Sequence, residues 1–157
     1  MPKSPNNIKV CFAASSGGHL DEVLALRPLM ERYDSFILTE KTKYDADFPV
    51  RARYVAQVNR REVSLLPRML ANFIASLKIW HKEKPDVIVC VGALATIPFC
   101  LIGHLHGAKL VFIESFAKTS SPTMTGRLLH KYADRFYVQW DSMLPVYPDA
   151  RFVGGIY

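Results

Sequence analysis

Short apolar runs alternate along this chain with longer segments whose apolar residues recur at helical spacing. Residues 86–91 and 109–113 are apolar after their first residue, which is typical of parallel strands covered on both faces. Residues 64–81 repeat apolar side chains with a period near that of an α-helix. The alternation predicts an α/β fold built on one doubly wound, mostly parallel sheet.

The same patterns predict the remaining elements. We expect further strands over residues 8–14, 35–39, 54–58, 135–139 and 151–153, and further helices over residues 19–33, 93–106 and 123–132. No repeat, low-complexity tract or linker divides the 157 residues. We therefore expect a single domain, 1–157, with a flexible segment 1–7 and a C-terminal tail 146–157.

The net charge of the chain limits the classes of molecule that it can be expected to bind. The formal charge of +6 favours an anionic partner, and by itself leaves open nucleic acid, a lipid surface or a phosphorylated substrate. Nucleic acid is disfavoured because the basic residues are scattered and form no recognition-helix, zinc-finger or RNP pattern. We expect no nucleic-acid partner.

Cysteines and hydropathy bear on the compartment. Cys11, Cys90 and Cys100 are odd in number, lie in apolar surroundings and lack metal-ligand spacing, so we expect core thiols in a reducing compartment. The N-terminus lacks the apolar core of a signal peptide, and no apolar run reaches the roughly 20 residues that span a bilayer. These features predict a cytoplasmic protein that is at most peripheral on a membrane.

A glycine loop follows the first predicted strand and consists of Ser15, Ser16, Gly17, Gly18 and His19. The two glycines permit a sharp turn that aims backbone N–H groups and a helix dipole at one point, where a phosphate would fit. The loop lacks the Gly-Lys-Ser/Thr of a P-loop, so a plain tight turn between strand and helix is the alternative.

Polar or small residues also end other predicted strands. They are Gly92, Glu114, Ser115 and Gln139. Because the carboxyl ends of parallel strands form one edge of a sheet, where ligands bind, we expect these residues and the glycine loop to line one site.

Four motifs occur in an order that one family shares. They are Ser-Ser-Gly-Gly-His, Val-Gly-Ala with a nearby Ile-Pro, Phe-Ile-Glu-Ser-Phe-Ala, and Tyr-Ala-Asp-Arg-Phe-Tyr-Val-Gln-Trp. Over residues 8–155 the chain resembles the acceptor-side, membrane-recruiting subunit of split glycosyltransferases. One branch of that family belongs to the eukaryotic UDP-N-acetylglucosamine transferase that extends dolichol-diphosphate-linked sugar. The other serves capsule and exopolysaccharide synthesis in bacteria.

The resemblance implies a Rossmann-like domain equivalent to the N-terminal half of a GT-B glycosyltransferase. It implies a heterodimer in which a separate chain binds the UDP-sugar. This chain, inactive or weakly active alone, would bind a polyprenyl-diphosphate-linked saccharide through the glycine loop, at the cytosolic face of a membrane. GT-B enzymes usually achieve inverting transfer without a metal, and we expect no cofactor.

The resemblance also assigns the end of the chain. Gly154, Gly155, Ile156 and Tyr157 would dock the donor-binding partner.

The alternative from a different class is a stand-alone nucleotide-binding module, which would bind a free nucleotide tightly without a second chain.

Individual polar side chains leave alternatives open. His19 binds a phosphate, acts as the base for the acceptor hydroxyl, or shapes the turn. Glu114 meets a sugar hydroxyl or caps the next segment. Glu40 lies where a dinucleotide fold places its ribose-binding acid, but Lys41 and Lys43 beside it favour a solvated loop.

Histidines and aromatics suggest weaker candidates. His104, His106 and His130 suggest a metal site, but surface histidines are favoured because the first two diverge on a helix. Trp140 and Tyr147 suit core or rim packing better than a platform for a sugar ring.

The helix predicted over residues 64–81 has a broad apolar stripe flanked by basic residues. It would suit the headgroup layer of an anionic membrane, but a helix that covers the sheet is favoured. Exposed residues on this helix and over residues 98–105 would hold the domain near its lipid-linked acceptor.

Overall fold

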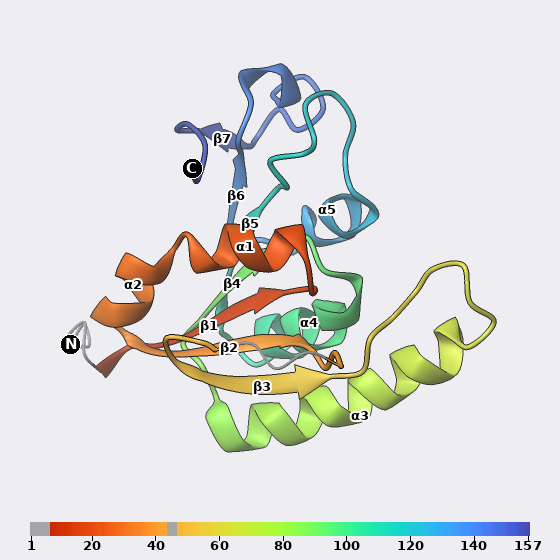
Figure 1. Ribbon diagram of the computed structural model, residues 1–157. Coiled ribbons are helices and arrows are strands. Elements are labelled where there is room, and N and C mark those ends of the chain that lie inside the picture. The colour runs from red at the N-terminus through yellow and green to blue at the C-terminus, as the bar shows by residue number, and fades with distance from the viewer. Residues whose placement is uncertain (1–6, 44–46) are drawn as a thin grey trace.

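The computed structural model describes residues 7–43 and 47–157. Their strands form one sheet in which every neighbouring pair is parallel, in the order β3-β2-β1-β4-β5-β6-β7 (Figure 1). The strands are β1 (Lys9–Ala14), β2 (Asp34–Glu40), β3 (Arg51–Val55), β4 (Val87–Val91), β5 (Lys109–Ile113), β6 (Arg135–Val138) and β7 (Arg151–Phe152). The predicted doubly wound α/β fold is confirmed.

Helices cover both faces of the sheet. They are α1 (Gly18–Leu24), α2 (Arg27–Arg32), α3 (Leu65–Glu83), α4 (Ile97–Leu105) and α5 (Met124–Leu129), with the 3-10 turns η2 (Leu94–Thr96) and η3 (Asp141–Met143). α1 and α2 lie on one face, and α3 and α4 on the other (Figure 1). Phe12 and Ile37 pack into the core beneath α1 and α2, whereas Cys11 and Phe36 pack into the opposite core. Both faces of the strands are buried, which explains the uninterrupted apolar runs.

Three predicted elements differ from the structure. The helix expected over 19–33 is two short helices, and the second begins with Pro28 in its first turn, a position that lacks an intrahelical acceptor. The helix expected over 93–106 likewise starts as a 3-10 turn and becomes α-helical only around Pro98. The strand expected over 54–58 lies at Arg51–Val55, because the backbone beyond it is bonded by side chains instead of by a neighbouring strand.

The expectation of exposed residues over 98–105 is largely wrong. In α4 the residues from Ile97 to Gly103 are buried except Leu101, because the helix packs between α3 and the sheet, and Leu105 alone is a strongly exposed apolar side chain there. Cys11, Cys90 and Cys100 are free and buried, as predicted, and burial raises the pKa of Cys11. The expected flexible segment 1–7 lies, except for Asn7, outside the described residues.

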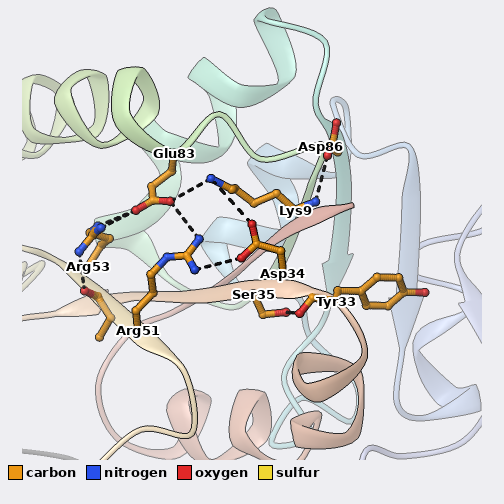
Figure 2. A network of polar contacts seen from close by, with 9 residues as sticks. Lys9, Tyr33, Asp34, Ser35, Arg51, Arg53, Glu83 and Asp86 are labelled. Atoms are coloured by element: carbon orange, nitrogen blue, oxygen red, sulfur yellow. Dashed lines mark hydrogen bonds and ion pairs between the residues drawn. The ribbon is translucent and has the colours of Figure 1, made fainter. Parts of the chain in front are cut away.

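An ion-pair network anchors the C-terminal end of α3 to the amino ends of the first strands (Figure 2). Glu83 accepts hydrogen bonds from Arg53 Nε at 2.8 Å, Arg51 Nη2 at 3.2 Å and Lys9 Nζ at 3.4 Å. Asp34 in turn accepts from Arg51 Nη1 at 3.0 Å. Burial acts to raise the pKa of Glu83, but the hydrogen bonds from the two arginines outweigh it, so this pKa is lowered. The network lies at the edge of the sheet opposite the carboxyl ends of the strands.

Among residues 7–43 and 47–157, no helix has both the length and the apolar character needed to cross a membrane.

Candidate functional site

The direction of winding reverses between β1 and β4, which are neighbours in the sheet. The loops after these strands begin at Ser15 and Gly92, and Ser15 Oγ donates to the Gly92 carbonyl oxygen at 3.3 Å. Ligands of doubly wound sheets bind at the carboxyl ends of the strands at such a reversal. The structure thus brings the glycine loop and Gly92 together where a ligand site is expected.

The glycine loop is held by a buried carboxylate. It turns through Gly17, whose φ of 85° is accessible mainly to glycine. Ser16 donates to Glu40 Oε2 from its backbone N–H at 3.2 Å and from Oγ at 2.9 Å, and Glu40 Oε1 accepts from Val58 N–H at 3.1 Å. Glu40 is only 6% exposed, so the preference for a solvated loop here is wrong. Three hydrogen-bond donors compensate for the cost of burying its charge.

His19 lies over Gly92. A Cβ atom added at Gly92 would be 2.9 Å from His19 Cε1, so the missing side chain makes room for the imidazole. The His19 side chain is 31% exposed. Its ring lines two adjoining cavities, whereas its Nδ1 atom is buried with no hydrogen-bond partner among the described residues.

Glu22, one turn along α1, is a buried carboxylate that the sequence analysis missed. Its Oε1 accepts from Ser115 Oγ at 2.9 Å and lies 3.8 Å from His19 Nδ1. Its Oε2 accepts from Phe116 N–H at 3.1 Å and from Gln139 Nε2 at 2.7 Å. Burial acts to raise the pKa of Glu22, but these polar contacts, led by His19, outweigh it and lower the pKa. The sequence signal that could have identified Glu22 is an acidic residue next to the apolar residues of a predicted helix.

Glu114 is fully buried behind this cluster. Its oxygens accept from Ser115 N–H at 3.0 Å, Thr123 Oγ1 at 2.9 Å, Thr123 N–H at 3.1 Å and Tyr147 Oη at 2.9 Å. Thr123 Oγ1 also accepts from Gly126 N–H and so caps α5. Four donors occupy about the number of lone-pair sites that a carboxylate has. This geometry is that of the capping alternative, and an acceptor contact for Glu114 stays a prediction.

Basic side chains line the two cavities beside His19. The first cavity, of about 260 Å³, is lined by His19, Arg60, Gly92 and Thr123 among others. The second, of about 420 Å³, shares His19, Arg60 and Thr123 and adds Lys118 and Arg127. The sequence analysis did not assign these three cations to the site, because the loops that carry Arg60 and Lys118 and the helix α5 that carries Arg127 approach it only in the folded chain.

The C-terminal tail lies against the same cluster. Ile156 N–H donates to Gln139 Oε1 at 2.9 Å, and the Tyr157 ring packs edge-on against Phe116 with centroids 5.4 Å apart. A Cβ atom at Gly155 would be 3.3 Å from the Phe116 ring. The tail is otherwise exposed, with Tyr157 at 69%.

The remaining aromatic candidates have packing roles. Trp140 donates from Nε1 to the Phe116 carbonyl oxygen at 2.7 Å and packs on its ring. Tyr147 is buried, which raises its pKa, and the nearby charge of Glu114 adds to this shift. His130 packs against both Tyr147 and Phe136, which also contact each other.

The other two histidine candidates also contact aromatic rings. His104 packs against Tyr132, and His106 packs against Trp80. In the part of the chain that the structure describes, no three His, Cys, Asp or Glu residues gather as they would around a metal ion.

The fold defines a class of protein, the Rossmann-like α/β domains with the GT-B fold. The crystal structure of MurG from Acinetobacter baumannii has this fold, with a TM-score of 0.76 at 16% identity over 96% of this chain and 46% of that chain. A profile described as "Oligosaccharide biosynthesis protein Alg14 like" matches residues 31–156. The chain therefore belongs to the Alg14-like family, and the resemblance found in its motifs is confirmed.

Two relatives differ in how much of their own length this chain matches. The UDP-N-acetylglucosamine transferase subunit ALG14 of Yarrowia lipolytica is 28% identical over 95% of this chain and 81% of its own length. The UDP-N-acetylglucosamine–N-acetylmuramyl-(pentapeptide) pyrophosphoryl-undecaprenol N-acetylglucosamine transferase of Syntrophus aciditrophicus is 27% identical over 86% of this chain and 41% of its own length. This chain thus spans most of the subunit but less than half of that longer transferase.

Proposed function

We propose that this chain is the acceptor-binding, partner-recruiting subunit of a two-chain inverting glycosyltransferase. The complex transfers a sugar from a UDP-sugar to a polyprenyl-diphosphate-linked saccharide at the cytosolic face of a membrane, in lipid-linked oligosaccharide or exopolysaccharide synthesis. One relative's name describes a subunit of a UDP-N-acetylglucosamine transferase, and the other's names a pyrophosphoryl-undecaprenol acceptor. Family membership and these names support the proposal.

The observation that carries the proposal is the set of three cations that line the cavities beside His19, near the reversal between β1 and β4. Arg60, Lys118 and Arg127 line the cavities beside His19, and a diphosphate needs such fixed positive charge. α1 has only seven residues, so these side chains supply more of the attraction than its dipole. Arg60 and Arg127 can each bind a phosphate with two parallel hydrogen bonds.

The glycine loop completes the acceptor site in this proposal. Gly17 and Gly18 bring backbone N–H groups to the diphosphate, and His19 either donates to a phosphate oxygen or takes the proton of the acceptor hydroxyl. Ser15 and Ser16 hold the loop through their contacts with Gly92 and Glu40. Ser115 positions Glu22 behind the imidazole.

The exposed side of α3 supports a membrane-facing role. The apolar stripe consists of Val63, just before α3, and of Leu66, Leu70, Phe73 and Ile74 on the helix, and its members are exposed by between 45% and 102%. Basic side chains flank this stripe, and it starts beside the loop that carries Arg60, near the carboxyl edge of the sheet (Figure 1). Insertion of this stripe into an anionic headgroup layer would place the acceptor's diphosphate near the cations.

Transfer assays on the reconstituted pair test the proposal. UDP release from UDP-N-acetylglucosamine is measured with a polyprenyl-diphosphate-linked saccharide for this chain alone, for the donor-binding chain alone and for both together. We expect the pair to be far more active than either chain. Arg127→Ala should raise the KM for the acceptor by about tenfold or more, the cost of one charged hydrogen-bond pair. Arg135→Ala, an exposed arginine at the amino end of β6, is the matched control.

Two results would contradict the proposal. A folded partner whose activity does not rise when this chain is added would remove the role in transfer. Tight binding of a free nucleotide by this chain alone would favour the stand-alone nucleotide module.

A further inference from the structure

A continuous line of polar contacts joins the C-terminal tail to His19. Ile156 N–H donates to Gln139 Oε1 at 2.9 Å, and Gln139 Nε2 donates to Glu22 Oε2 at 2.7 Å. The other oxygen of Glu22 lies 3.8 Å from His19 Nδ1. Four residues from distant parts of the chain therefore connect the outer surface to the candidate site.

The middle of this line is buried and hydrogen-bonded. Glu22 and Gln139 are each 4% exposed. Ser115 Oγ and Phe116 N–H hold the two carboxylate oxygens of Glu22, and Gln139 also donates to the Glu114 carbonyl oxygen at 3.0 Å. Any change at one end is therefore passed on as a change in hydrogen-bond geometry and not absorbed by water.

Both ends of the line are less constrained. The tail is largely exposed and is held here by the Ile156 amide and by ring contacts with Phe116. At the other end, 3.8 Å is too long for a hydrogen bond, and His19 Nδ1 has no such partner among the described residues. A small movement of Glu22 toward the ring would create that bond.

We propose that Glu22 is a positioning residue that, through Gln139, makes the orientation and tautomer of His19 depend on the position of the C-terminal tail. The inference rests on the proposed function and on the prediction, implied by the family resemblance, that the tail docks the donor-binding partner. When Nδ1–H donates to Glu22, Nε2 carries the free lone pair and can accept a proton. His19 therefore takes the tautomer that can accept the proton of the acceptor hydroxyl only when the second chain has docked on the tail.

Nitrogen-15 NMR of histidine-labelled full-length chain tests the coupling without any substrate. Ile156→Pro removes the N–H that Gln139 accepts, and Ile156→Ala keeps it. We expect Glu22→Gln and Ile156→Pro each to change the tautomer ratio of His19 by about threefold or more, on the scale of one modest hydrogen bond. The first variant removes the charge beside Nδ1, and the second releases Gln139 and so lets Glu22 move. Ile156→Ala should leave the ratio within error of wild type.

Two NMR outcomes would overturn the inference. One is an unchanged His19 spectrum in both Glu22→Gln and Ile156→Pro while the rest of the spectrum shows a folded chain. The other is an equal change in Ile156→Ala and Ile156→Pro, which would mean that the side chain and not the N–H matters. Ile156→Pro alone decides the matter if Glu22→Gln does not fold.

Kinetics of the reconstituted pair give a second readout. Glu22→Gln should lower kcat by about tenfold or more and change the acceptor KM by less than about twofold, because a positioning residue acts on the reacting step. A rise of about tenfold in the acceptor KM with unchanged kcat would contradict a positioning role for Glu22. The NMR experiment does not depend on turnover. It can therefore contradict the coupling between the tail and His19 while the pair still transfers sugar, and transfer by the pair can fail while the coupling is observed.

Discussion

At the scale of the residue, the site depends on which atoms are missing as much as on which are present. His19 occupies the space where a side chain at residue 92 would be, and Gly92 has a φ of 31°. The same contact fixes the ring against the carboxyl end of β4. A single methyl group at this position is therefore enough to displace the imidazole.

Gly92→Ala should abolish most transfer by the reconstituted pair, because the new Cβ would lie 2.9 Å from His19 Cε1. We expect the free energy of unfolding to fall by about 1–2 kcal/mol from left-handed strain, measured by urea unfolding. Gly107→Ala is the control, since Gly107 has a φ of 89° with nothing within 4 Å of an added Cβ. Equal activity in the two variants would refute the role of the contact.

At the scale of the element, α3 has two different sides. One side carries buried polar residues, including Asn72, which bonds both backbone groups of Ala56 at 2.8 Å, and Glu83 in the ion-pair network (Figure 2). The other side carries the exposed apolar stripe. Of the two alternatives that the sequence offered, the structure shows a helix that packs on α4 and β3, and membrane contact through the stripe stays a prediction.

Glu83→Gln should lower the free energy of unfolding by about 1.5–3 kcal/mol at pH 7, the range for hydrogen bonds to a charged group. The pKa of Glu83 is lower in the folded chain than its ordinary value of 4.5. Its contribution is therefore present above pH 4.5 and lost as the pH falls through the lowered pKa. Urea unfolding should show the full difference at pH 7 and a smaller one at pH 3. Glu31→Gln, in an exposed pair with Arg27, is the control that changes little.

Leu66→Glu with Leu70→Glu should reduce binding to anionic vesicles by about tenfold or more, because each leucine gives up apolar burial and adds a negative charge. Co-sedimentation at low salt measures the bound fraction. Leu29→Glu, on α2 at 42% exposure, is the matched control outside the stripe. Undiminished binding of the double variant would count against membrane contact through α3.

At the scale of the whole molecule, one sheet positions three distinct regions. They are the cavities with their cations, the apolar stripe and the C-terminal tail. The stripe starts near the carboxyl edge of the sheet, where the cavities lie, and the tail reaches the same cluster through Gln139. Such an arrangement suits a subunit that joins a lipid-linked acceptor to a second chain.

Deletion of residues 154–157 should weaken capture of the donor-binding chain by about tenfold or more, since an aromatic anchor at an interface contributes on that scale. The melting temperature should change little, because the tail is largely exposed and its contacts are few. Co-purification and calorimetric titration measure the capture. Unaltered affinity in the truncated chain would exclude the tail as a docking segment.

The sequence by itself determined the order of the elements, the parallel sheet, the position of the glycine loop and the family, because burial on both sheet faces and a local turn leave their mark on neighbouring residues. It did not determine the partners of the buried polar groups. Gln139 meets Glu22 across 117 positions, and Glu40 holds Ser16 across 24. These contacts depend on strand order, register and the rotation of each helix about its axis. Only the tertiary structure decides such quantities, because residue spacing along a chain carries no information on which side chains face each other across a fold.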